Sequence, residues 1–123
     1  MRRILIVDDE HLVADTLSLI FEKNGFEARA AYSTDEALLC ARGFKPDLLV
    51  CDLNMPERDG FELISAINAM QPSCRILVLT GAYASMHRVS QSSRDLRRQL
   101  SVVTKPCHPA ELLRQAGELL LTA

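Results

Sequence analysis

The fold of this chain is decided by residues 48–60, which read LLVCDLNMPERDG. The apolar run from Leu48 to Cys51 is typical of a strand that is buried on both faces of a sheet. Asp52 closes this strand, and the asparagine, proline and glycine beyond it predict a tight connection in which Asp59 is a turn former. A carboxylate at the mouth of a buried strand has the setting of a reactive group, so Asp52 is the first candidate functional residue.

Three other apolar runs also end in polar side chains. They are residues 4–7 before Asp8 and Asp9, residues 76–79 before Thr80, and residues 102–103 before Thr104 and Lys105. The carboxyl ends of neighbouring parallel strands share one edge of a sheet, and open α/β sheets place their ligands at that edge. The sequence therefore predicts one crevice that gathers three carboxylates, a hydroxyl and an ammonium group.

Strand-like runs alternate with helical patterns along the whole chain. The expected strands are residues 3–7, 26–31, 48–51, 75–79 and 101–104. With right-handed crossovers, this alternation predicts a flavodoxin-like (βα)5 doubly wound parallel sheet with strand order 2-1-3-4-5. A length of 123 residues suits one core, so residues 1–123 are interpreted as a single domain.

The helical segments carry start and stop signals. Asn24-Gly25 predicts a left-handed stop for the first helix, and Ser33 with Glu36 has the spacing of a capping box that opens a second helix closing at Gly43. Apolar residues at helical spacing predict the buried faces. They are Leu12, Val13, Leu17, Ile20 and Phe21 in the first helix, Phe61, Ile64 and Ile67 (extending to Met70 at most) in the third, and Leu112, Leu113, Ala116, Leu119 and Leu120 in the last.

The segment from residue 81 to residue 101 has the weakest pattern. Its apolar residues at helical spacing are Met86, Val89, Leu96 and Leu100. Because Ser93 interrupts this stripe, we expect a marginal or mobile fourth helix. Arg94, Arg97 and Arg98 share one face of it and are interpreted as solvated side chains, with a docking patch for an acidic partner as the alternative.

Composition excludes several classes of protein. The net charge is −2 at pH 7, so the chain has no electrostatic footprint for direct binding to nucleic acid or to an anionic membrane. The longest apolar run near the N-terminus is too short for a signal peptide or a membrane span, which makes a cytoplasmic location the default expectation. The cysteines lack metal-ligand spacing and are interpreted as small reduced apolar residues: Cys40, Cys51, Cys74 and Cys107.

The predicted crevice has a definite chemistry. Each pair of carboxylates at about 4 Å repels by roughly 4 kcal/mol at an effective dielectric near 20, so Asp8, Asp9 and Asp52 invite a divalent cation. Oxygen ligands favour Mg²⁺, to which the backbone carbonyl of Asn54 could add a further ligand. The metal and Lys105 would also attract a phosphoryl group, which a strand-end carboxylate can attack.

These residues together resemble the receiver domain of two-component response regulators. The resemblance covers nearly the whole chain: Asp8-Asp9 after the first strand, Asp52-Leu53-Asn54-Met55-Pro56 through Asp59-Gly60, Thr80 after the fourth strand, and Lys105-Pro106 after the fifth. It implies a phosphoprotein of a two-component system or phosphorelay that carries out signal transduction. Such a protein is not an enzyme in the usual sense, although it can catalyse its own phosphotransfer and dephosphorylation.

The resemblance also implies the roles of single residues. Asp52 would accept a phosphoryl group from a phosphohistidine on a sensor histidine kinase or a histidine phosphotransfer protein. Asp9, Asp52 and the Asn54 carbonyl would coordinate Mg²⁺, and Asp8 would reach it through water. Thr80 and Lys105 would bind the phosphoryl oxygens, and the Lys105-Pro106 peptide would be cis. An unidentified downstream protein would read the change, and the receiver would be a monomer or a weak homodimer.

Two alternatives remain open at the sequence level. The family usually has an aromatic residue three positions before the lysine, where this chain has Val102. A pseudo-receiver that binds partners without phosphorylation is therefore the second hypothesis. The third is a phosphatase of the haloacid dehalogenase type, which carries a second aspartate two residues after its nucleophile. Asn54 occupies that position here and cannot serve as the general acid.

Overall fold

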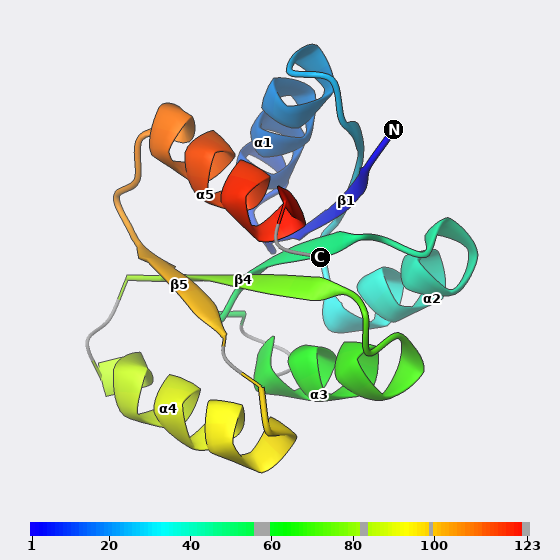
Figure 1. The fold of residues 1–123 in the computed structure, drawn as a ribbon. Coiled ribbons are helices and arrows are strands. Elements are labelled where there is room, and N and C mark those ends of the chain that lie inside the picture. Colours follow the sequence, from blue (N-terminus) through cyan, green and yellow to red (C-terminus); the bar gives the residue numbers. More distant parts are fainter. Residues whose placement is uncertain (56–59, 82–83, 99, 122–123) are drawn as a thin grey trace.

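Five strands alternate with five helices in the computed structural model, which describes residues 1–55, 60–81, 84–98 and 100–121. The elements are β1 (Arg3–Val7), α1 (His11–Lys23), β2 (Glu27–Ala31), α2 (Thr34–Phe44), β3 (Leu48–Asp52), α3 (Gly60–Met70), β4 (Arg75–Thr80), α4 (Ala84–Leu96), β5 (Ser101–Thr104) and α5 (Pro109–Leu121). Figure 1 shows their arrangement. Asp59, predicted as a turn former, and the side chain of Met86 lie outside what the structure describes.

The strands form one parallel sheet in the order β2-β1-β3-β4-β5, which confirms the predicted topology. The register pairs Val7 with Cys51, Asp52 with Leu79, and Thr80 with Thr104. The ends of four strands therefore stand at one level along the sheet. The polar residues that follow them share the carboxyl edge, as the sequence predicted.

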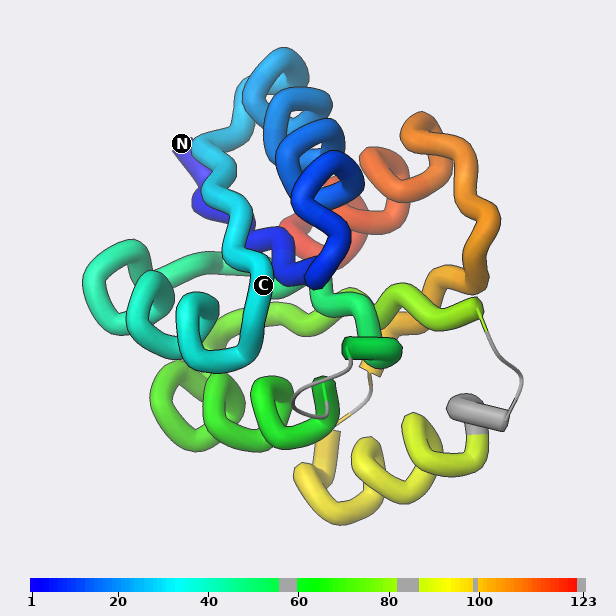
Figure 2. Tube along the Cα trace, turned by 180° about the vertical axis from the view of Figure 1, so that it is seen from behind, coloured from blue at the N-terminus to red at the C-terminus, as the bar shows by residue number. Residues whose placement is uncertain are grey.

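Helices cover both faces of the sheet, because alternate strand residues point to opposite sides. Ile4, Ile6 and Val50 belong to the apolar cluster that contacts α1 and α5. Leu5 and Leu49 belong to the cluster on the other face, beneath α2 and α3. The views from the front and from behind both show α1 and α5 together on one side and the other three helices on the opposite side (Figures 1 and 2).

The ends of α2 show one success and one error of the local signals. The Ser33 hydroxyl oxygen accepts a hydrogen bond of 3.1 Å from the backbone N–H of Glu36, so the predicted cap is confirmed. The prediction that the helix closes at Gly43 is wrong, since the helix continues to Phe44 and Lys45 takes the left-handed conformation (φ 51°). Gly25, in contrast, has the left-handed φ of 93° expected at the end of α1.

The buried face of α1 is rotated from the predicted stripe. Ala14, Ser18 and Phe21 are its buried residues, whereas Leu12 is 80% exposed. Small residues at positions 14 and 18 let the helix lie close to the sheet, and apolar spacing alone cannot distinguish them from a polar face. The predicted stripe of α5 is confirmed, with Leu112, Ala116 and Leu120 buried. Met70 at the end of α3 is exposed.

Arg98 corrects the interpretation of a solvated arginine face. Its guanidinium group donates hydrogen bonds to the backbone oxygen of Cys74 (2.8 Å) and to the side-chain oxygen of Asn68 (2.9 Å). It thereby fastens the end of α4 to the connection between α3 and β4. Arg94 is exposed, as expected, and Arg97 has a left-handed φ of 54° just after the helix.

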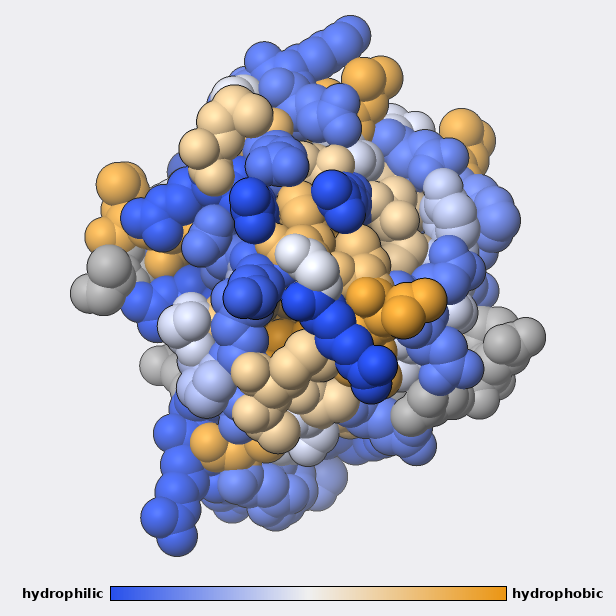
Figure 3. All heavy atoms as spheres, turned by 90° about the vertical axis from the view of Figure 1, so that its right-hand side faces the viewer, coloured by the Kyte–Doolittle hydropathy of each residue, from blue (hydrophilic) through white to orange (hydrophobic). Residues whose placement is uncertain are grey.

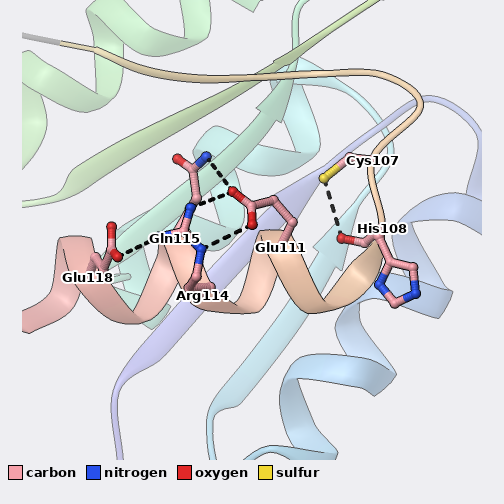
Figure 4. Close-up of polar contacts among 6 residues, drawn as sticks. All are labelled: Cys107, His108, Glu111, Arg114, Gln115 and Glu118. Atoms are coloured by element: carbon pink, nitrogen blue, oxygen red, sulfur yellow. Dashed lines mark hydrogen bonds and ion pairs between the residues drawn. The ribbon is translucent and has the colours of Figure 1, made fainter.

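Ion pairs also run along the surface of α5. On α5, Arg114 forms ion pairs with Glu111 and Glu118 along the exposed side of the helix (Figure 4). On the side that faces the amino ends of the strands, hydrophilic side chains are interspersed with smaller apolar areas (Figure 3).

Among the helices of the described ranges, none combines the length and apolar character that a bilayer crossing requires.

Candidate functional site

The carboxyl edge of the sheet brings Asp8, Asp52 and Lys105 into direct contact. The Lys105 Nζ atom donates a hydrogen bond of 2.9 Å to Oδ2 of Asp52 and lies 3.5 Å from Oδ2 of Asp8. Asp52 and Asp8 are 4% and 1% exposed, so both carboxylates are buried beside one ammonium group. The convergence predicted from strand ends that are 53 residues apart in the chain is confirmed for this pair.

Backbone amides orient the two buried carboxylates. The N–H of Glu10 donates to Oδ1 of Asp8 and the N–H of Asn54 donates to Oδ1 of Asp52, each at 2.9 Å. Each contact spans two residues at the start of the loop that follows the strand. Both strands therefore end in the same local turn, in which a backbone N–H of the loop donates to the carboxylate of the aspartate two residues earlier.

The two acids share one cation, which leaves Asp8 with an unfavourable environment. Burial raises the pKa of the Asp8 carboxyl, and the negative charge of Asp52 adds to this, while the Glu10 amide and Lys105 oppose it. The buried Oδ2 atom of Asp8 accepts no hydrogen bond from the described residues. The Lys105 Nζ atom is 3.5 Å away, which is an ion pair without a close hydrogen bond, so this buried oxygen is suited to a further positive ligand.

Lys105 is held in place by the sheet as well as by its charge. Its backbone N–H donates to the carbonyl oxygen of Thr80 at 2.8 Å, and the Lys105-Pro106 peptide is cis, as the resemblance implied. Burial alone would lower the pKa of the Lys105 ammonium, but the hydrogen bond and charge of Asp52, with the charge of Asp8, raise it above its ordinary value. Thr80 is fully buried at the end of β4, one residue beyond the partner of Asp52.

The acid cluster fits a hard divalent cation. Asp8, Asp9 and Asp52 each offer a carboxylate oxygen, and these oxygens lie within 4.8 Å of one another. Such spacing suits a shared metal ion, and an all-oxygen set favours Mg²⁺ over zinc or copper. The Oδ2 atom of Asp8, which is ion-paired with Lys105 but accepts no hydrogen bond from the described residues, supports the same conclusion. Asp9 is half-buried, so the cluster is open to solvent on its side.

Gly60 is a structural requirement of the site that the sequence did not reveal. A Cβ atom at this position would lie 3.0 Å from the backbone oxygen of Asp52 and 3.0 Å from the Cα atom of Leu53. The first turn of α3 therefore packs directly on the end of β3. A glycine beside an aspartate suggested only a turn, because the close approach depends on residues that meet through the tertiary fold.

A family model described as the response regulator receiver domain matches residues 4–116. This chain belongs to that family. The receiver domain has relatives that include the transcriptional regulatory protein PrrA of Mycobacterium tuberculosis, which is 32% identical over 120 residues, covering 96% of this chain and 49% of PrrA. Sporulation initiation phosphotransferase F of Bacillus subtilis is 26% identical over 110 residues, covering 89% of this chain and 84% of that protein.

Solved structures agree with the assignment of the receiver domain. A CheY-like receiver domain protein from Methanospirillum hungatei has a TM-score of 0.87 at 30% identity, covering 98% of this chain and 94% of its own. The chemotaxis protein CheY4 of Vibrio cholerae has a TM-score of 0.85 at 26% identity, covering 97% and 98%. The chain spans about half the length, or less, of several curated relatives that it matches.

Val102 stands where the family usually has an aromatic residue, three positions before the lysine. Val102 is half-buried in β5 and packs with the apolar cluster that contains Val89 and Leu100. Phe61 of α3 is part of the same cluster, with the guanidinium carbon of Arg88 4.4 Å from the centre of its ring. The aromatic side chain on this side of the described structure therefore comes from α3 and not from β5.

Proposed function

We propose that the receiver domain switches a downstream protein when Asp52 accepts a phosphoryl group from a phosphohistidine. The observation that carries this proposal is the pair of buried acids that share Lys105, with Oδ2 of Asp52 only 2.9 Å from its Nζ atom. Asp52 Oδ2 is the attacking oxygen, since Oδ1 is held by the Asn54 amide. A new bond forms between this oxygen and phosphorus, and the bond from phosphorus to the imidazole nitrogen breaks.

Two side chains, those of Lys105 and Thr80, bind the oxygens of the phosphoryl group once it is on Asp52. The Lys105 ammonium moves from Asp52 to the phosphoryl oxygens, so one positive charge remains beside the reacting atoms throughout the transfer. The Thr80 hydroxyl donates a hydrogen bond to another phosphoryl oxygen. Thr80 is fully buried and joined to Lys105 through its backbone carbonyl, so a shift of either residue is transmitted to β4 and β5.

The acid cluster is the proposed Mg²⁺ site. Asp9, Asp52 and the backbone carbonyl of Asn54 would hold the ion directly, and Asp8 would hold it through water. When bound, Mg²⁺ neutralises phosphoryl oxygens and lowers the repulsion among the carboxylates. Asp8, Asp9 and Asp52 have the oxygen donors and spacing that this role needs.

The biological setting follows from the family and is part of the proposal. Residues 1–123 act as one receiver domain in the cytoplasm, as a monomer or a weak homodimer. The phosphoryl donor is a sensor histidine kinase or a histidine phosphotransfer protein, and the reader of the signal is another protein. The only chemistry of the receiver is its own phosphotransfer and dephosphorylation, so it is not an enzyme with a separate product.

Mass spectrometry after incubation with Mg²⁺ and a cognate phosphohistidine donor tests the proposal, with acetyl phosphate as a substitute donor. We expect one phosphoryl group per chain, lost in Asp52→Asn. Asp47→Asn is the matched control, because the Asp47 carboxylate binds the backbone N–H of Arg3 and precedes β3 instead of following it. An adduct that persists in Asp52→Asn, or no adduct from any donor, would overturn the proposal.

A further inference from the structure

A cleft of about 480 Å³ opens between α1 and α5 beside the proposed phosphoacceptor site. Val13 and Leu17 of α1 form one wall, Leu112 of α5 forms the opposite wall, and Leu79 of β4 contributes from the sheet. This volume lies within the range of about 300–1,000 Å³ that is typical of small-molecule sites. Most of the lining is aliphatic, so the cleft suits a small apolar group.

The cleft is continuous with the reactive site through Lys105. Lys105 lines the cleft, and its Nζ atom contacts Asp52 at 2.9 Å. Glu10 lies at the same place, and its backbone N–H holds Asp8. A ligand whose phosphoryl group reaches Asp52 therefore has an aliphatic cavity within reach of its other end. The ammonium group at one end and the aliphatic walls match a molecule with an anionic head and an apolar tail.

We propose that this cleft binds the aliphatic chain of acyl phosphates, which makes medium-chain acyl phosphates better small-molecule donors than acetyl phosphate. This inference rests on the proposed function of Asp52. The carboxylate oxygen of Asp52 bonds to phosphorus while the bond from phosphorus to the acyl oxygen breaks. The electron pair leaves with the acyl oxygen as a free carboxylate, and no proton has to move.

The wall residues set the selectivity. Val13, Leu17, Leu79 and Leu112 offer no charged group to a second carboxylate, and the exposed side chain of Glu10 repels one. Neutral straight chains are therefore favoured over acyl groups that end in a carboxylate. Each methylene buried in the cleft is expected to raise the phosphorylation rate at low donor concentration about two- to fourfold, where fourfold corresponds to ~0.8 kcal/mol.

The decisive experiment compares acetyl, butyryl and hexanoyl phosphate with the Mg²⁺-loaded receiver domain. Phosphoramidate, which has no carbon chain, normalises the reactivity of Asp52 in every variant. We expect the normalised rate to rise with chain length in the wild type. Val13→Phe fills the cleft from α1, so the rates for the three donors should become equal. Leu12→Phe adds the same ring at a position that is 80% exposed and not part of the cleft, and it should retain the gain.

The outcomes separate this inference from the proposed function. Equal rates for all three acyl phosphates in the wild type overturn the inference and leave phosphorylation of Asp52 intact. No adduct from any donor, phosphoramidate included, overturns the proposed function. Binding then decides the inference by itself: 2-oxohexylphosphonate should shift the methyl NMR signals of Leu17 and Leu112 more than acetonylphosphonate does. Methyl signals that do not shift would refute the inference, and an apolar side chain of a docking protein would then be the better candidate occupant of the cleft.

Discussion

Two regions of this receiver domain are held together by different interactions. At β1 and β3, the site carboxylates stand on strands whose apolar residues are essentially unexposed. Asp8 and Asp52 are each fixed by a backbone amide two residues further along, so their positions depend on main chain more than on side chains. The phosphoacceptor geometry is therefore a property of the sheet.

The region around α4 depends on side chains instead. Among the described side chains of α4, Val89 is the buried apolar one. The guanidinium groups of Arg88 and Arg98 contact α3 and the loop that follows it. Breaking one of these contacts lets water take the place of the lost partner, so each contact contributes only modestly to the free energy of unfolding. The comparison indicates that main-chain contacts fix the site carboxylates, whereas side-chain contacts hold the α4 region, so we expect α4 to open more readily than the sheet.

The largest stability effect is expected in the site region, from Gly60→Val. The added side chain would start 3.0 Å from backbone atoms of Asp52 and Leu53, neither of which can move without displacing the end of β3. We expect the free energy of unfolding to fall by roughly 3 kcal/mol, measured by chemical denaturation. Gly43→Val is the matched control.

Gly43 lies on the exposed side of α2, and a Cβ atom there would meet nothing within 4 Å. Its replacement by valine should change the free energy of unfolding by no more than about 0.5 kcal/mol. Equal losses at the two glycines would contradict the close packing of α3 on β3 as the cause.

A smaller effect, confined to the other region, is expected from Arg98→Ala. The change removes donors from the backbone oxygen of Cys74 and from Asn68, and should cost roughly 1–2 kcal/mol because the guanidinium is only partly buried. Amide hydrogen exchange should become faster in α4 and unchanged in β1 and β3. Arg94→Ala, in the last turn of α4 and exposed, should have no more than about a quarter of this effect. Faster exchange throughout the sheet would show that the two regions are not separable.

These two regions also differ in how far the sequence could predict them. The strand order and the meeting of Asp52 with Lys105 were predicted, because polar residues that follow buried parallel strands must share one edge. The Mg²⁺ ligands remain predictions, although the acids that carry them cluster as expected. In this region, topology alone places the groups that matter.

Local pattern failed where a tertiary contact decided the outcome. Arg98 was expected in solvent, yet its partners lie 24 and 30 residues away and nothing near it in sequence marks them. Lys45, not Gly43, ends α2 in the left-handed conformation, which a lysine adopts only at some cost. Leu12 was expected in the core, but the small residue Ala14 is the one that faces the sheet.

Asp8→Asn should stabilise the site region by about 1 kcal/mol in the absence of Mg²⁺. Burial and the charge of Asp52 raise the pKa of the Asp8 carboxyl, which shows that its ionised form is unfavourable in the folded protein. An amide removes this charge at the same volume. Thermal unfolding measures the gain, and Asp9→Asn is the comparison, with a smaller gain since Asp9 is half-buried. A loss of stability in Asp8→Asn would show that the contact with Lys105 outweighs the burial of the acid.

The least perturbing test of the comparison is the reactivity of two buried cysteines at pH 8. Cys51 lies in β3 and Cys74 lies beneath Arg98, and both are fully buried. Burial raises the pKa of the Cys74 thiol to about 12, so at pH 8 the folded protein holds it almost wholly as the unreactive thiol. Iodoacetamide should therefore modify both residues only through opening of the structure. In Arg98→Ala, modification of Cys74 should become at least about tenfold faster relative to Cys51. The reason is that losing the hydrogen bonds of the Arg98 guanidinium group should open only the region around α4. Equal acceleration at both cysteines would mean that α4 and the phosphoacceptor strands open as one unit, which would refute the separation between them.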